Sequence, residues 1–227
     1  MADIGLLNEK PLHASLKDWY ARPGDICEVA VDKYVIDIVR HDLLLEIQTG
    51  GFASIKSKLL DLVDAHRVRL IYPIAREKWI LKLAKEDGGG YSRRKSPKTG
   101  RVEDLFWEMV SFPQLLANDN FSLEVLMIRE EEVRRHEEKQ NWRRRGWTTH
   151  ERRLLEVVDR HLFTNPVEWL ALLPQTLGES FTTGDLAEIL GIRRSLAQKM
   201  AYCLRKAGAI EQVGRQGRAN NYRIVGV

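Results

Sequence analysis

The fold is decided by residues Tyr34–Lys58, which read YVIDIVRHDLLLEIQTGGFASIKSK. Two short runs rich in Val, Ile and Leu, Tyr34–Val39 and Leu43–Thr49, flank a polar break at Arg40-His41-Asp42. Short apolar runs on either side of a polar turn are typical of a β-hairpin. The sequence therefore predicts two antiparallel strands here, followed by a helix that starts near Phe52.

Each predicted strand carries one carboxylate where a core residue would be expected, Asp37 on the first and Glu46 on the second. If His41-Asp42 is a two-residue turn, these side chains lie directly opposite each other. Like charges in opposed positions destabilise a sheet, and partial burial increases that cost. A divalent cation such as Mg²⁺ removes the conflict, because hard cations prefer carboxylate oxygens. The pair is therefore a candidate metal site; the alternative is a hairpin whose polar face meets water.

The order of Asp37, then Glu46-Ile47-Gln48, then a helix resembles the metal-binding core of the PD-(D/E)xK nuclease superfamily. The resemblance implies an α/β fold of the restriction-endonuclease-like kind, a mixed sheet with flanking helices. It also implies that Asp37 and Glu46 hold Mg²⁺ or Mn²⁺. In the family, a Lys two residues after the second acid helps to orient or activate the attacking water, and Gln48 stands at that position here.

Some members of the superfamily have Gln at this position, and others place the Lys on the following helix, where Lys56 or Lys58 would fill the role. The family often keeps another metal-facing acid on the first helix, which would be Glu9 here; the alternative for Glu9 is an ordinary carboxylate favoured by the helix dipole. Glu28 is a further acid that would reach the metal. We expect the scattered histidines to be surface or core residues, because none has zinc-ligand spacing: His13, His41 and His66.

Length and composition indicate two modest domains with a basic bias. The chain has 227 residues and a formal net charge of +4, and its basic residues cluster late, which favours nucleic acid as a partner. Cys27 and Cys203 form neither a disulfide framework nor a zinc pattern, so a reducing cytoplasm is expected. No run is long and apolar enough to span a membrane, and the N-terminus lacks a signal-peptide pattern.

Periodicity and turn residues predict the other elements of a first domain over residues 1–141. A Gly-rich basic loop is expected at Lys85–Arg101, either a solvated insertion or a segment that contacts phosphates. The charged run Arg129–Arg145 is expected to be a solvated helix that leads to a domain boundary near Arg143-Arg144-Arg145-Gly146. The remaining expected elements are helices at Asn8–Tyr20, Phe52–His66 and Val102–Leu116, and strands at Ile26–Val31, Val68–Ile74 (ended by Pro73), Lys78–Leu83 and Phe121–Ile128.

The second domain is expected over residues 142–227. It would begin with helices at His150–Phe163 and Val167–Leu173. The segment Ser180–Val225 then resembles a winged helix-turn-helix over its whole length. The resemblance implies a helix capped by Thr182 or Thr183, a turn at Gly191-Ile192, a recognition helix Arg193–Ala207 stopped by Gly208, and a hairpin of Ile210–Val213 with Tyr222–Val225 around a tip at residues 214–221.

The outward positions of this segment carry donors suited to DNA. Side chains on the recognition helix would contact phosphates and base edges in the major groove, and cations on the tip would contact the minor groove or the backbone. The alternative is a helix-turn-helix used for protein contacts. The expected DNA-binding residues are Arg193, Arg194, Gln198, Lys199, Tyr202, Arg215 and Arg218.

These features favour a metal-dependent DNA endonuclease that hydrolyses phosphodiesters and is brought to DNA by a winged helix, with duplex DNA as the favoured partner. The second interpretation is a DNA-binding transcription regulator whose nuclease-like domain has lost catalysis and serves in homodimerisation or sensing. Gln48 favours the regulator, whereas the retention of Asp37 and Glu46 favours the nuclease. A third interpretation is an accessory subunit of a defence or repair complex.

Overall fold

Two β-sheets organise the protein, whose computed structural model describes residues 10–83, 90–137 and 146–225. Within these residues, the large sheet has seven strands in the order β1-β2-β3-β4-β6-β7, with β5 paired to β4, and the small sheet has the order β8-β10-β9. The large sheet comprises β1 (Ile26–Val31), β2 (Tyr34–Arg40), β3 (Leu43–Ile47), β4 (Arg67–Lys82), β5 (Ser92–Lys95), β6 (Phe121–His136) and β7 (Trp147–Phe163). The small sheet comprises β8 (Phe181–Thr182), β9 (Ile210–Gln216) and β10 (Ala219–Ile224).

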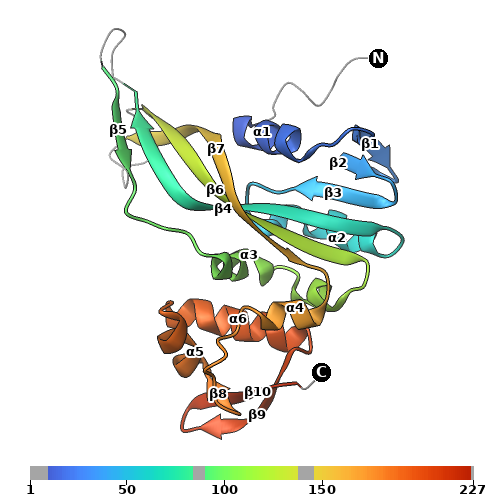
Figure 1. Ribbon diagram of the computed structural model, residues 1–227, viewed down its shortest axis with the longest axis vertical. Helices are drawn as coiled ribbons and strands as arrows, with labels where there is room; N and C mark the ends of the chain where they lie inside the picture. The colour runs from blue at the N-terminus through green and yellow to red at the C-terminus, as the bar shows by residue number, and fades with distance from the viewer. Residues whose placement is uncertain (1–9, 84–89, 138–145, 226–227) are drawn as a thin grey trace.

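Helices cover both faces of the large sheet (Figure 1). The α-helices are α1 (Pro11–Tyr20), α2 (Lys56–Val63), α3 (Phe106–Met109), α4 (Pro166–Leu170), α5 (Thr183–Leu190) and α6 (Arg194–Lys206). Short 3₁₀ turns are η2 (Phe52–Ser54), η3 (Val102–Leu105) and η4 (Pro113–Ala117), so the single helix expected over 102–116 is instead three short pieces. None of the helices in the described ranges combines the length and the apolar character needed to cross a bilayer. The large sheet of parallel and antiparallel strands, with helices on both faces, confirms the expected mixed α/β architecture.

The predicted hairpin is confirmed, including its turn. Strands β2 and β3 pair antiparallel with Ile38 opposite Leu45 and Arg40 opposite Leu43, so His41 and Asp42 form the two-residue turn. His41 has a φ of 55°, the left-handed conformation that such a tight turn requires. Strand β3 then pairs parallel with β4, and the helix α2 lies in the crossover between them, as parallel neighbours require.

Two hydrophobic clusters lie on opposite faces of this sheet. On one face, Leu12, Leu16 and Tyr20 of α1 pack against side chains of β2, β3, β4 and β6. On the other face, the cluster includes Phe52 and Phe106 and continues to side chains of the C-terminal segment. Strand β3 therefore lies between two packed layers and is held firmly in place.

Three predictions about strand ends and helices were wrong. Strand β4 passes through Pro73 and includes the residues assigned to a separate strand at Lys78–Leu83. The run expected to be a solvated helix from Arg129 is strand β6 as far as His136, and residues 138–145 lie outside the described residues. The helix expected at His150–Phe163 is strand β7, which pairs antiparallel with β6.

The physical reason for these errors is charge pairing between strands that are distant in sequence. Glu130 on β6 is completely buried, but Arg152 on β7 and Lys78 on β4 contact its carboxylate. A buried carboxylate is tolerated when cations neutralise it, so a highly charged run can form a central strand. The spacing within one segment does not reveal partners that come from two other segments.

The C-terminal segment contains the predicted helix pair and hairpin. Thr182 caps α5 through a capping box with Asp185, and Gly191 ends the helix with a φ of 62°. Strands β9 and β10 extend further than expected, so the tip between them is only Gly217-Arg218. The expected boundary at residues 141 and 142 lies outside the described residues, and β7, which was expected in the second domain, belongs to the large sheet.

Candidate functional site

Asp37 and Glu46 lie at the end of the β2–β3 ladder. The paired register ends with Ile38 opposite Leu45, so Asp37 and Glu46 are the next residues along the two strands. The backbone N–H of Ile47 donates to Asp37 Oδ2 over 2.7 Å, so the Asp37 carboxylate occupies the gap where a strand-to-strand hydrogen bond would otherwise form. Glu46 is only 3% exposed, and the two acids are therefore held in a confined space.

The two carboxyl groups have pKa values shifted in opposite directions. Burial raises the pKa of Asp37, but the hydrogen bond with His13, the His13 charge, the Ile47 N–H and the Lys58 charge outweigh burial, so the net pKa lies below its usual value. Burial, together with the negative charge of Asp37, raises the pKa of Glu46 to about 7 despite the opposing effect of Lys58. Asp37 is therefore ionised at neutral pH. Glu46, whose pKa is close to neutral pH, exists there as a mixture of its protonated and ionised forms.

Lys58 reaches the acid pair and Lys56 does not. Lys58 projects from α2, its Nζ lies 2.5 Å from Glu46 Oε1, and it donates to the backbone carbonyl of Val35 over 2.6 Å. Lys56, on the preceding part of the same helix, is exposed. Of the two candidate lysines, Lys58 is therefore the one that contacts the acid pair.

Gln48 points toward the loop that follows β3. Its Nε2 donates to the carbonyl of Gly51 over 2.8 Å and to Ser54 Oγ over 3.0 Å. These bonds hold the turn between β3 and α2, the helix that carries Lys58. In this arrangement the Gln48 amide N–H groups position a loop, and the expected role of orienting water would fall to its remaining oxygen.

His13 is the site residue that sequence analysis missed. It lies on α1, and its Nε2 is 3.3 Å from Asp37 Oδ2. No spacing motif links it to Asp37, because α1 reaches the site only when it packs across the sheet. Of the two further acids, Glu28 pairs with Lys17 over 2.6 Å, and Glu9 lies outside the described residues.

Three of the expected DNA-binding residues come together in one groove. Arg194 and Gln198 of α6 and Arg218 of the β9–β10 tip line a cavity of about 190 Å³. Tyr202 and Arg215 are exposed elsewhere on α6 and β9, and Arg193 immediately precedes α6. A helix and a hairpin tip that present donors to the same groove suit recognition of a nucleic-acid backbone and base edges.

Lys199 differs from the other expected DNA contacts. Its Nζ lies 5.6 Å from the centroid of the Trp107 ring on α3, a cation–π contact inside the protein. Lys199 therefore faces the large sheet and its helices, and we assign it to the packing of α6 on α3.

Residues 10–164 match a family described as "Domain of unknown function (DUF8091)". The chain belongs to the DUF8091 family. It is also 30% identical to an uncharacterised protein of Treponema pallidum (strain Nichols) over 97% of this chain and 87% of that protein. No solved structure matches the chain.

The DUF8091 region coincides with the large sheet and its first helices. It begins at the residue before α1 and ends at the residue after β7. Asp37, Glu46 and Lys58 all lie inside it, and the groove of Arg194, Gln198 and Arg218 lies beyond it.

Proposed function

We propose that the protein is a metal-dependent nuclease that hydrolyses phosphodiester bonds in DNA. The observation that carries this proposal is the contact between Lys58 on α2 and Glu46 on β3, beside Asp37 on β2. A cation on the helix that follows the second acid is one of the arrangements expected from the resemblance to the PD-(D/E)xK superfamily. The mixed sheet with helices on both faces agrees with that expectation at the level of fold class.

The residues present fit a divalent cation in two respects. Glu46 is 3% exposed and lies beside Asp37, with one oxygen paired to Lys58, so two carboxylates share a confined space. Burial and then the charge of Asp37 raise the pKa of Glu46, and a divalent cation would relieve that cost. Within the described residues no group of three metal-ligating side chains is found. Mg²⁺ commonly uses one or two carboxylates and completes its shell with water and substrate phosphate, so Asp37 and Glu46 are sufficient protein ligands.

Each protein group then has a defined part. Asp37 and Glu46 would hold the cation, which would supply polarisation of the scissile phosphate and a lowered pKa for a bound water molecule. Asp37 stays ionised because His13 and the Ile47 N–H stabilise its negative form. The Lys58 ammonium stabilises negative charge that develops on the phosphate, which is the usual role of a cation placed at a reacting oxyanion.

The C-terminal helix pair and hairpin are proposed as a winged helix that holds the DNA. The groove lined by Arg194, Gln198 and Arg218 supports this assignment, because it joins α6 to the hairpin tip. Variants in this groove would then weaken DNA binding without altering the acid pair, because the acid pair lies on the large sheet.

The test compares cleavage of plasmid and single-stranded DNA by the wild type, Lys58→Ala and Lys56→Ala in Mg²⁺, Mn²⁺ and EDTA. We expect Lys58→Ala to slow cleavage by about 100-fold or more, the usual loss for removing one group that stabilises a reacting oxyanion. Lys56→Ala is the matched control on the same helix and should cleave like the wild type. Circular dichroism of both variants checks their folding, and Lys58→Arg should restore part of the rate. A wild type that cleaves neither substrate with either metal would overturn the proposal.

A second candidate is a DNA-binding regulator in which the large sheet serves as a homodimerisation or sensor module. The observation that favours it is the use of both Gln48 N–H groups within the β3–α2 loop, away from a water-orienting role. This candidate predicts sequence-specific DNA affinity without hydrolysis in any metal.

A further inference from the structure

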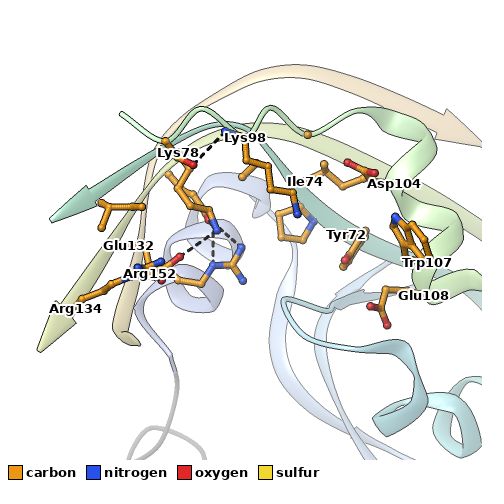
Figure 2. Close-up of a pocket in the computed structure, with 16 residues that line it drawn as sticks. Tyr72, Ile74, Lys78, Lys98, Asp104, Trp107, Glu108, Glu132, Arg134 and Arg152 are labelled. Atoms are coloured by element: carbon orange, nitrogen blue, oxygen red, sulfur yellow. Dashed lines mark hydrogen bonds and ion pairs between the residues drawn. The ribbon is translucent and has the colours of Figure 1, made fainter. Parts of the chain in front are cut away.

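A charged cavity of about 500 Å³ lies on the α3 side of the large sheet, and its lining includes neither Asp37 nor Glu46. Its walls come from β4, β6 and β7, from η3 and α3, and from the segment after β5. Figure 2 shows that the labelled residues gather at two ends. Lys78, Glu132, Arg134 and Arg152 lie at one end, and Tyr72, Asp104, Trp107 and Glu108 lie at the other. A cavity of this volume accommodates a small organic ligand.

At the first end, buried glutamates hold cations in fixed positions. Arg152 donates to Glu130 Oε2 through Nε and Nη2, over 2.9 Å and 2.5 Å, and Lys78 Nζ lies 2.7 Å from Glu130 Oε1. Lys78 and Arg134 also contact Glu132. Charged groups anchored in this way lose little conformational entropy when a ligand binds. With Lys98, four cations line the cavity near two acids, so this end favours an anionic group.

At the second end, aromatic rings lie beside two carboxylates. Tyr72 packs edge-on against Phe52 with 4.7 Å between ring centroids, and burial, followed by the charge of Glu108, raises its pKa to about 12. Its hydroxyl therefore keeps its proton. Trp107 adds a second ring to the lining. These groups favour a flat heterocycle, because aromatic side chains stack with rings.

The carboxylates at this end each retain an oxygen for a ligand. Glu108 Oε2 accepts from the backbone N–H of Phe52, and Asp104 Oδ2 accepts from the backbone N–H of Arg101. Neither Glu108 Oε1 nor Asp104 Oδ1 has a hydrogen bond to a described residue. Free carboxylate oxygens accept from ring N–H and amino groups, so this end favours a heterocycle that carries such donors.

Lys98 supplies an exposed positive charge between the two ends. Its side chain reaches into the middle of the cavity (Figure 2), and its ammonium forms no ion pair within residues 10–83, 90–137 and 146–225. An exposed and unpaired lysine beside anchored cations is suited to closing on a phosphate.

We propose that this cavity binds a nucleotide, with the phosphate at the Lys78–Lys98–Arg152 end and the base between Tyr72 and Trp107. The opposite charge preference of the two ends matches a molecule that has an anion at one end and a hydrogen-bonding heterocycle at the other. The proposal goes beyond the nuclease proposal, because it concerns a different cavity and requires no hydrolysis.

The nucleotide has two sources with the same chemistry, a free mononucleotide or one unit of a nucleic-acid strand. A second cavity of about 470 Å³ shares Lys98, Asp104 and Trp107 with the first and reaches Arg193 at the start of α6. If the unit belongs to a strand, Arg193 would contact the neighbouring phosphate. The dependence on Arg193 therefore separates the two sources.

The experiment is isothermal titration calorimetry of the full chain in EDTA, so that cleavage plays no part. The probes are the four nucleoside 5′-monophosphates, inorganic phosphate, and a single-stranded octanucleotide. We expect Lys98→Ala to weaken the binding of the nucleotide or of the octanucleotide about tenfold or more, because the variant removes a charge-assisted hydrogen bond to the phosphate. Arg94→Ala is the matched control, because Arg94 is an exposed cation on β5 outside the cavity.

Two conservative variants test the base end. Tyr72→Phe deletes only the hydroxyl, and Glu108→Gln keeps an acceptor for Phe52 while it changes one ligand-facing oxygen. We expect Glu108→Gln to alter which of the four bases is preferred, an effect that a purely structural role would not produce.

The two sources of the nucleotide predict different results for the Arg193→Ala variant. If the ligand is a strand, Arg193→Ala should weaken the octanucleotide in the wild type but little further in the Lys98→Ala background, and should leave the mononucleotide unchanged. If the ligand is a free nucleotide, any effect of Arg193→Ala on the octanucleotide should be the same in both backgrounds, as expected for a contact made by the winged helix alone. The proposal is overturned if neither nucleotide nor octanucleotide binds, if Lys98→Ala and Arg94→Ala have equal effects, or if inorganic phosphate binds as tightly as the nucleotides.

Discussion

At the scale of single residues, the acid pair could be predicted and its supporting residues could not. Asp37 and Glu46 stand out because a carboxylate interrupts each of two apolar strands. Their proximity at the end of the paired register follows from the local turn at His41-Asp42, which the sequence reveals. His13 joins Asp37 only through the packing of α1 across the sheet, and no local pattern encodes that contact.

The acid pair gives a direct prediction about metal binding. We expect the wild type to bind Mg²⁺ or Mn²⁺ in calorimetric titrations and Asp37→Ala to lose this binding, because one of two carboxylate ligands is removed. Asp42→Ala is the matched control, since Asp42 lies in the same hairpin but is exposed and paired with Arg67. Equal affinity for the wild type and Asp37→Ala would exclude this pair as the metal site.

Glu132 gives a prediction about pH. Burial opposes its ionisation, but hydrogen bonds from Arg134 and Thr149 and the charge of Lys78 lower its pKa from 4.5 to about 2. A carboxylate with a depressed folded-state pKa stabilises the fold above its unfolded pKa, and this stability is lost as pH falls from about 4.5 toward 2. We expect Glu132→Gln to lower the urea midpoint clearly at pH 7 and much less at pH 3. A midpoint difference that does not shrink at low pH would contradict the assigned cause.

At the scale of elements, local turn and cap signals predicted more than periodicity did. The β2–β3 hairpin and the α5 capping box form as expected, because their determinants lie within a few residues. Strand β7 was missed because Leu154, Leu155, Val158 and Leu162 repeat at a helical spacing. Pairing with β6 overrides that spacing, and such tertiary control of a segment is not visible in its own residues.

Replacing Arg152 measures how much its contacts with β6 and with the loop after β3 contribute to the stability of β7. It bonds the buried Glu130 twice and donates to the carbonyl of Thr49, next to the turn that Gln48 holds. We expect Arg152→Ala to lower the free energy of unfolding by about 3–5 kcal/mol, the cost of leaving a buried charge without its partner.

The control for this prediction lies on the same strand. Arg153 pairs with Glu131 and Glu151 and is half exposed, so Arg153→Ala should cost about 1 kcal/mol or less. Urea denaturation of both variants measures the difference. If both cost the same, the Glu130 network does not anchor β7.

At the scale of the whole molecule, one buried cluster joins the large sheet to the C-terminal helices. Phe52 and Phe106 belong to the same cluster as Trp169, Phe181 and the buried residues of α6. Arg101 also donates to the carbonyl of Leu190 over 2.6 Å, which links η3 to the end of α5. The change in composition along the sequence predicted two domains. Composition does not reveal whether the side chains of two segments share one buried core.

DNA binding is best tested on the intact chain. Each phosphate that a cation neutralises contributes roughly −0.9 to the slope of log affinity against log salt for duplex DNA. We expect Arg218→Ala to flatten this slope by about one unit and to weaken binding equally on all sequences. Gln198→Ala should leave the slope unchanged and alter sequence preference by about 1–3 kcal/mol. An intact protein without affinity for duplex DNA at low salt would remove the DNA-binding assignment.

The pairing of β6 with β7 also has a consequence for biosynthesis. The ribosome releases the acidic half of β6 before any residue of β7, so Glu130, Glu131 and Glu132 emerge without Arg152 or Arg153. A nascent chain tends to fold from its N-terminal end as it emerges. We therefore expect the sheet to stay incomplete, with an open edge at β6, until residue 163 has left the exit tunnel. A chain interrupted by premature termination within β7 would keep that edge open and become a substrate for chaperones and proteases.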